Sequence, residues 1–197
     1  MSRFTLLAPA FVLTAFLTPG SLRAQDEAPK KPGAEEAALE VVQAYVEKLK
    51  AKDAEAGMQE CFDFEELCKG IFKGAFSKMS KPDRAETAKL FYEILVPTMT
   101  EPQIAEAMAN ATYEGFTAEK PKQGKVRVSF TVTLPIEGME PTQQFYWVKK
   151  VKGEYRIVDM ANGAADRALS ELIGAQYRQN DPSKISPLEF TRMMKQG

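Results

Sequence analysis

Ten consecutive residues, Lys125 to Leu134, alternate strictly between polar and apolar side chains. Successive side chains of a β-strand point to opposite faces of a sheet, so this alternation is typical of a strand with one buried face. The apolar positions are Val126, Val128, Phe130, Val132 and Leu134. The chain must therefore form a sheet with an apolar side that other elements cover.

Two further strands are predicted shortly after this one, at Gln144 to Val151 and Glu154 to Met160. Only Lys152-Gly153 separates them, which is short enough for an antiparallel hairpin. Ala111 to Thr117 is a candidate fourth strand. We expect a curved antiparallel sheet of about four strands.

Helices are predicted on both sides of this strand region. From Glu35 onward, apolar residues follow one helical face: Leu39, Val42, Tyr45, Val46 and Leu49. Asp63 is placed to cap a second helix, with Glu66 reaching back to the cap. Ser80 repeats this pattern for a third helix bearing Phe91, which Pro97 should end or kink.

Three shorter helices complete the pattern. They begin near Pro102, around Leu169 and at Pro187, the last one running to Lys195. Helices first, an antiparallel sheet second and helices last describe a single α+β domain over residues 35–197, with helices covering one face of the sheet.

The first 24 residues have the order of a cleavable secretory signal: a charge at Arg3, an apolar run from Phe4 to Leu17, and a small-residue exit at Ala24. The apolar run is shorter than the roughly 20 residues that a spanning helix needs. Because Leu22 is an unusual residue just before such a cleavage site, an uncleaved anchor stays an alternative. Residues 25–34 mix charge, proline and glycine and are predicted to be a flexible linker.

The composition argues against most catalytic chemistry. The chain has no histidine, so it lacks the commonest general base and metal ligand. No cysteine spacing fits a zinc site and no glycine-rich loop follows a strand, so we expect no metal and no cofactor. Removal of Arg3 and Arg23 with the signal shifts the net charge from −1 to about −3. With no basic block, nucleic acid is not an expected partner.

The remaining candidate acids have simpler structural interpretations. Asp63 and Glu66 are explained by helix capping, and Asp159 is expected to hydrogen-bond the backbone of a turn at Asn162-Gly163. We therefore predict no catalytic residue and no enzyme. Cys61 and Cys68 lie too far apart along one continuous helix for a disulfide, although a chain reversal between them leaves the bridge open.

Three stretches of the sequence resemble one known family. Phe62-Asp63-Phe64 opens a helix that runs on to the Ser80 cap, Phe91-Tyr92-Glu93-Ile94-Leu95 forms an aromatic-rich helix, and Phe145 to Lys150 with Gly153 to Met160 forms a strand, turn, strand and aspartate. Their order and spacing over residues 35–179 resemble the periplasmic phospholipid carriers of the MlaC type, also called toluene-tolerance auxiliary proteins. One departure is Tyr177-Arg178, which follows Asp159 later than the family's tyrosine-arginine pair.

The resemblance implies a monomeric periplasmic protein that shuttles phospholipid and so supports outer-membrane lipid asymmetry. Its implied partners are an inner-membrane transporter complex and an outer-membrane lipoprotein and porin complex. The implied fold is MlaC-like or nuclear-transport-factor-two-like, with an apolar cavity. From strand alternation and hydrophobicity, the candidate cavity residues are Phe91, Val128, Phe130, Val132, Phe145, Trp147 and Ile157.

Other functions remain open at this point. A cone-shaped α+β domain could bind another apolar small molecule, and an envelope interaction module would have a filled core. An enzyme would require Asp159 to face a second acid in a cleft.

Overall fold

Helix α1 (Ala34–Lys50) opens the part of the chain that the computed structural model describes, residues 32–163 and 167–196. The predicted signal, residues 1–24, and most of the predicted linker lie outside the described residues. The predicted apolar face of α1 is confirmed, because Val42, Tyr45, Val46 and Leu49 are buried. Acids at its start and lysines at its end favour the helix dipole.

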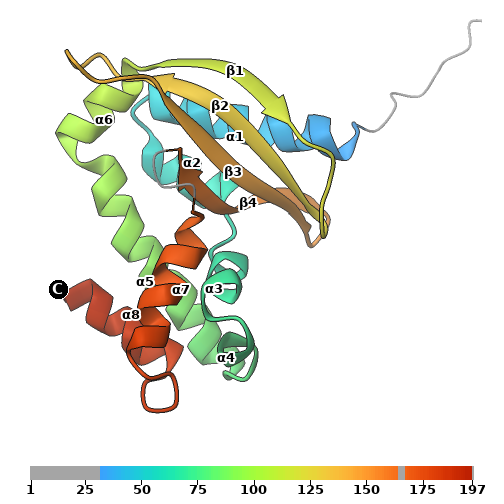
Figure 1. Cartoon of the computed structure of the whole chain (residues 1–197), viewed down its shortest axis with the longest axis vertical. Coiled ribbons are helices and arrows are strands. Elements are labelled where there is room, and N and C mark those ends of the chain that lie inside the picture. Colours follow the sequence, from blue (N-terminus) through green and yellow to red (C-terminus); the bar gives the residue numbers. More distant parts are fainter. Residues whose placement is uncertain (1–31, 164–166, 197) are drawn as a thin grey trace, which may run out of the picture. The chain divides into compact units, whose positions relative to one another are not determined.

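Within the described residues, four strands form one open antiparallel sheet in the order in which they occur in the chain (Figure 1). They are β1 (Thr112–Ala118), β2 (Lys125–Thr133), β3 (Thr142–Val151) and β4 (Glu154–Asn162). All four correspond to predicted strands, and the hairpin at Lys152-Gly153 is also as predicted. Register shifts interrupt the β1/β2 and β3/β4 pairings. Such bulges bend a sheet.

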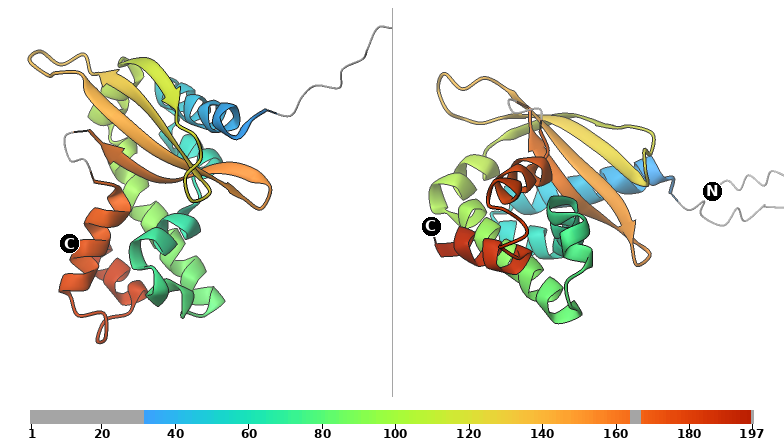
Figure 2. Two further views of the ribbon diagram at one scale, coloured as in Figure 1. Left: turned by 45° about the vertical axis from the view of Figure 1, so that its right-hand side comes forward. Right: turned by 60° about the horizontal axis from the view of Figure 1, so that its bottom comes forward.

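The two faces of the sheet differ sharply. On the inner face, Val126, Val128, Phe130 and Val132 of β2 are all buried, as the alternation predicts. Helix α1 lies along this face and contacts all four strands (Figures 1 and 2). The outer face carries the intervening polar residues of β2, beginning with Lys125 and Arg127.

The remaining helices of the described residues precede and follow the sheet. They are α2 (Ala54–Cys61), α3 (Phe64–Phe72), α4 (Gly74–Ser77), α5 (Lys81–Thr100), α6 (Pro102–Ala109), α7 (Leu169–Gln179) and α8 (Pro187–Gln196). Helix α2 was not predicted from the sequence, and the helix predicted to run from Asp63 to the Ser80 cap is divided at Lys73 into α3 and α4. Asp53 caps α2 by accepting a hydrogen bond from the Ala56 N–H.

The predicted helix caps are confirmed with one correction. The side chains of Asp63 and Ser80 accept hydrogen bonds from the backbone N–H groups of Glu66 (2.8 Å) and Asp83 (3.2 Å). The Glu66 side chain, however, does not return to the cap. It accepts hydrogen bonds from two lysine ammonium groups, those of Lys69 and Lys149, and so joins α3 to β3.

Two hydrophobic clusters fill the interior. The larger lies between the sheet and α1, α2 and the end of α5, and the smaller joins α3, α5, α7 and α8. Helix α5 serves both, because Phe91 belongs to the helical cluster and Val96 to the sheet cluster. It continues past Pro97 to Thr100, so Pro97 does not end it as one prediction allowed. Cys61 and Cys68 are free and lie in different clusters.

The α+β class expected from the sequence is confirmed by this arrangement. None of the helices in residues 32–163 and 167–196 combines the length and apolar character needed to cross a bilayer.

Candidate functional site

A cavity of about 280 Å³ lies on the inner face of the sheet, beneath α1 and beside α6. All four strands contribute to its wall. The helical side consists of Tyr45, Leu49, Met99, Ile104 and Met108, and the strand side includes Tyr113, Phe130, Val132, Leu134, Tyr146 and Met160. Most of the lining is therefore aliphatic, aromatic or thioether surface.

Stacked aromatic rings form the floor of this cavity. The ring of Phe130 stacks on Phe116 on one side, with centroids 4.7 Å apart, and on Tyr146 on the other, 5.5 Å apart. Phe130 pairs with Gln144 across the β2/β3 ladder, so Tyr146 is its diagonal neighbour. The stack joins three adjacent strands and makes this wall apolar.

Three tyrosines bring hydroxyl groups to the cavity. Tyr113 donates a hydrogen bond to the backbone oxygen of Met108 (2.7 Å), which ties β1 to α6, and burial raises its pKa to about 12. The hydroxyls of Tyr45 and Tyr146 have no hydrogen-bond partner among the described residues, although both side chains are buried. Burial also raises the pKa of both. Each is thus a neutral donor beside the apolar space.

Four methionines line the cavity: Met99, Met108, Met139 and Met160. An unbranched thioether changes rotamer at small cost, so these side chains can adapt the cavity to an occupant. Met139 stands in the β2–β3 loop and is 48% exposed, and Glu140 beside it is also exposed. The cavity therefore opens to solvent at this loop, where Thr142 and Gln144 add polar atoms.

The seven residues predicted for the cavity are not brought together. Phe130 and Val132 line it. Val128 and Ile157 are fully buried in the sheet cluster behind it, and Phe91 lies in the helical cluster. Phe145 and Trp147 lie on the outer face, which corrects the expectation that they enclose the cavity with the β2 residues. The cause is register, since they pair with the outward-facing Ser129 and Arg127.

Several cavity residues were missed from the sequence. Tyr146 lies between Phe145 and Trp147, and only the β2/β3 register shows that it is the inward member of the three. The helical contributors Tyr45 and Leu49 were on the predicted apolar face of α1, which signals burial but not a neighbouring void.

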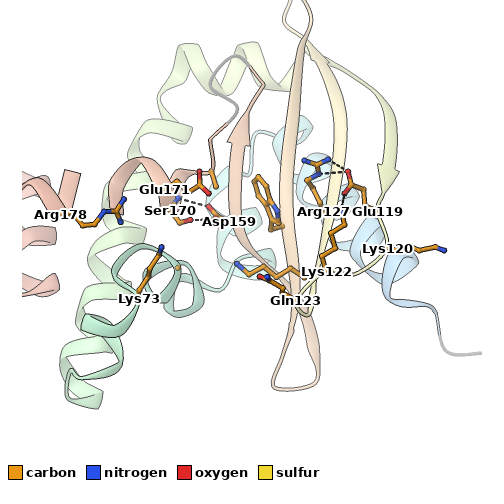
Figure 3. Close-up of a pocket in the computed structure, with 14 residues that line it drawn as sticks. Lys73, Glu119, Lys120, Lys122, Gln123, Arg127, Asp159, Ser170, Glu171 and Arg178 are labelled. Atoms are coloured by element: carbon orange, nitrogen blue, oxygen red, sulfur yellow. Dashed lines mark hydrogen bonds and ion pairs between the residues drawn. The ribbon is translucent and has the colours of Figure 1, made fainter. Parts of the chain in front are cut away.

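The outer face holds a second hollow of about 730 Å³, between the sheet and helices α3 and α7 (Figure 3). We call it the outer groove. Arg127 is on its strand side, and Lys73 and Arg178 are on its helical side. Trp147 of β3 also lines it. The inner cavity and the outer groove share no lining residue.

Asp159 lies in the outer groove and has a structural role that differs in detail from the prediction. Its Oδ1 accepts from the N–H groups of Met160 (3.0 Å) and Ser170 (3.1 Å), and its Oδ2 accepts from the Ser170 hydroxyl (2.5 Å). It therefore secures the start of α7 and not a turn at Asn162-Gly163. Burial raises its pKa, and these hydrogen bonds oppose that effect.

Three acids line the groove: Glu119, Asp159 and Glu171. Both carboxylate oxygens of Asp159 accept hydrogen bonds from Ser170. No group of three or more Cys, Asp or Glu side chains within residues 32–163 and 167–196 is arranged to hold a metal ion.

An open antiparallel sheet with helices over its inner face and an apolar cavity between them defines the class: an α+β domain with an internal apolar pocket. Among solved structures, the chain is similar to a phospholipid-binding protein from Ralstonia solanacearum, determined in complex with a phospholipid. The TM-score is 0.59 at 18% sequence identity, covering 84% of this chain and 96% of that one. The two proteins share a fold. No protein-family model and no curated protein matches the sequence.

Proposed function

We infer that this protein binds phospholipid, with acyl chains in the inner cavity and the headgroup at the β2–β3 loop. The observation that carries the inference is the apolar, aromatic-floored cavity, located in a fold shared with a phospholipid-binding protein. Each CH₂ group moved from water to such a site contributes about 0.8 kcal/mol, so acyl chains supply most of the affinity.

The size of the cavity requires it to widen for a whole phospholipid. Its volume of about 280 Å³ is just below the roughly 300–1,000 Å³ typical of small-molecule sites. The lining methionines allow the cavity to widen, because their side chains can move aside without disturbing the backbone. Met108 and Met160 lie on opposite walls, one on α6 and one on β4.

The fuller proposal is a monomeric, non-enzymatic carrier, exported to the periplasm, that moves lipid between inner- and outer-membrane complexes. Its support is the predicted export signal and the family resemblance of the sequence. A carrier needs a cavity that shields acyl chains from water and needs no catalytic group.

A second candidate is a binding protein for one defined apolar small molecule. The volume of the cavity suits such a molecule, and the unpartnered hydroxyls of Tyr45 and Tyr146 would donate to an acceptor atom on it. An interaction module with a filled core fits less well, because the cavity is present.

Native mass spectrometry tests the proposal. The full chain would be expressed in a bacterium with its predicted signal, and the mature protein purified without detergent. A phospholipid carrier should release masses that differ by acyl-chain length, whereas the second candidate releases one defined compound. A delipidated protein that neither arrives with phospholipid nor takes it up from vesicles contradicts the proposal.

A further inference from the structure

The outer groove concentrates positive charge in a protein whose net charge is close to neutral. The whole chain carries −1, yet the groove is lined by six lysine or arginine side chains and three acidic ones. The cations are Lys73, Lys120, Lys122, Lys125, Arg127 and Arg178. They come from the end of α3, from α7, from β2 and from the β1–β2 loop, so the fold assembles them from distant parts of the sequence.

Several of these cations are not neutralised by the protein itself. Arg127 pairs with Glu119, but Lys73, Lys120 and Arg178 form no ion pair within residues 32–163 and 167–196. Elsewhere, lysines such as Lys48 and Lys195 pair with a glutamate on another helix. The groove therefore has positive charge available for a ligand.

The positions of the cations favour an elongated ligand. Lys73 and Arg178 are on the helical side of the groove, while Arg127 and Lys120 are on the strand side (Figure 3). They do not converge on one point, as binding of a single phosphate would require. They also line a hollow, which a flat bilayer surface reaches poorly and a polypeptide segment can enter. Its volume of about 730 Å³ has room for several residues.

The floor of the groove adds a surface for side-chain packing. Trp147 is half-buried there, and its indole ring offers an apolar face between the charged walls. The three acids that line the groove partly offset its positive charge. A moderately acidic segment therefore matches the groove better than a dense polyanion such as nucleic acid.

We propose that the outer groove binds an extended acidic segment of a partner protein, through Lys120, Arg178 and the face of Trp147. This inference is independent of lipid binding, because the groove and the inner cavity are on opposite faces of the sheet and share no residue.

Trp147 is the only tryptophan of the chain and reports on the groove directly. The purified mature protein would be titrated with a tryptophan-free peptide of alternating glutamate and serine while the Trp147 emission is recorded. We expect a saturable change that weakens as salt is added, because the interaction depends on charge. A peptide in which glutamine replaces glutamate should give no saturable change.

The decisive variant combines Lys120→Glu with Arg178→Glu, two exposed positions on opposite walls. It should bind the acidic peptide about tenfold more weakly or worse, since like charges then face the ligand. Lys78→Glu with Lys81→Glu makes the same charge change on exposed sites outside the groove and should bind as the wild type does.

Three outcomes would overturn the proposal. They are no saturable response to the acidic peptide, equal weakening in the two double variants, and binding to phosphatidylglycerol vesicles that needs Lys120 and Arg178 while the peptide gives no response. The last would assign the groove to an anionic membrane surface.

Discussion

The inner and outer faces of the same sheet differ in chemistry although they are built from the same strands. On the inner face, Phe130 and Tyr146 stack above an apolar cavity, whereas on the outer face Arg127 and Trp147 line a cationic groove. Strand alternation makes this possible, since neighbouring residues point to opposite sides. One small sheet can thus present two unlike binding surfaces, and variants on one face should leave the other intact.

The largest expected difference concerns stability. Phe130 is 2% exposed, so Phe130→Ala should lower the free energy of unfolding by about 3–5 kcal/mol. Phe145, on the adjacent strand but the outer face, is only half-buried, and Phe145→Ala should cost about 1–2 kcal/mol. Urea denaturation measures both. Equal losses would show that the two faces do not differ in packing as described.

Asp159→Ala should have an intermediate effect on the free energy of unfolding. It leaves the N–H groups of Ser170 and Met160 without their acceptor, at a cost of about 1–3 kcal/mol. Glu171→Ala removes an exposed acid from the same groove and should change stability by no more than about 0.5 kcal/mol. If the two variants lose the same stability, Asp159 does not anchor α7.

The smallest effect concerns pH. Burial alone would raise the pKa of Glu66, but hydrogen bonds from Lys149 and Lys69 outweigh it and hold the pKa below its usual value. A lowered folded-state pKa stabilises the protein above the unfolded value of about 4.3, and this contribution disappears as the pH falls through the folded value.

Lys149→Met tests this linkage between α3 and β3. The side chains of Lys149 and Glu66 are both partly exposed. The variant should therefore lose about 1 kcal/mol or less of its free energy of unfolding at neutral pH. The difference from the wild type should shrink as the pH falls below about 4. Thermal melts at several pH values measure it, and a difference that is constant with pH would contradict the assigned role of Glu66.

Local features of the sequence were sufficient to predict most elements. Asp63 and Ser80 mark helix starts because their side chains cap the backbone within the next turn, and the alternation of Lys125 to Leu134 needs no distant partner to be recognised. Helix α2 escaped prediction because it is short and contains Gly57. Packing favours glycine there, since a Cβ would lie only 3.0 Å from the Tyr45 ring.

The site was harder to predict because it depends on register. Aromatic residues occupy both faces of β3 at Phe145, Tyr146 and Trp147, so its own pattern does not show which points inward. The loop between β2 and β3 is too long for a tight turn that would fix the pairing. Lys120 and Arg178 are distant in sequence, so only the folded chain shows that they line one groove.

Filling the inner cavity tests the proposed lipid site without altering the outer face. Met108→Trp places a large ring in the cavity from α6, and Met193→Trp makes the same change at a residue that is 51% exposed on α8. The Lys120→Glu and Arg178→Glu double variant alters only the outer groove.

The most direct test of the central claim is the amount of phospholipid that copurifies with each of these proteins, per mole of folded chain. We expect Met108→Trp to lose most of its lipid, while Met193→Trp and the outer-groove variant keep the wild-type amount. Full lipid content in Met108→Trp, or its loss in the outer-groove variant, would contradict the assignment of lipid to the inner face.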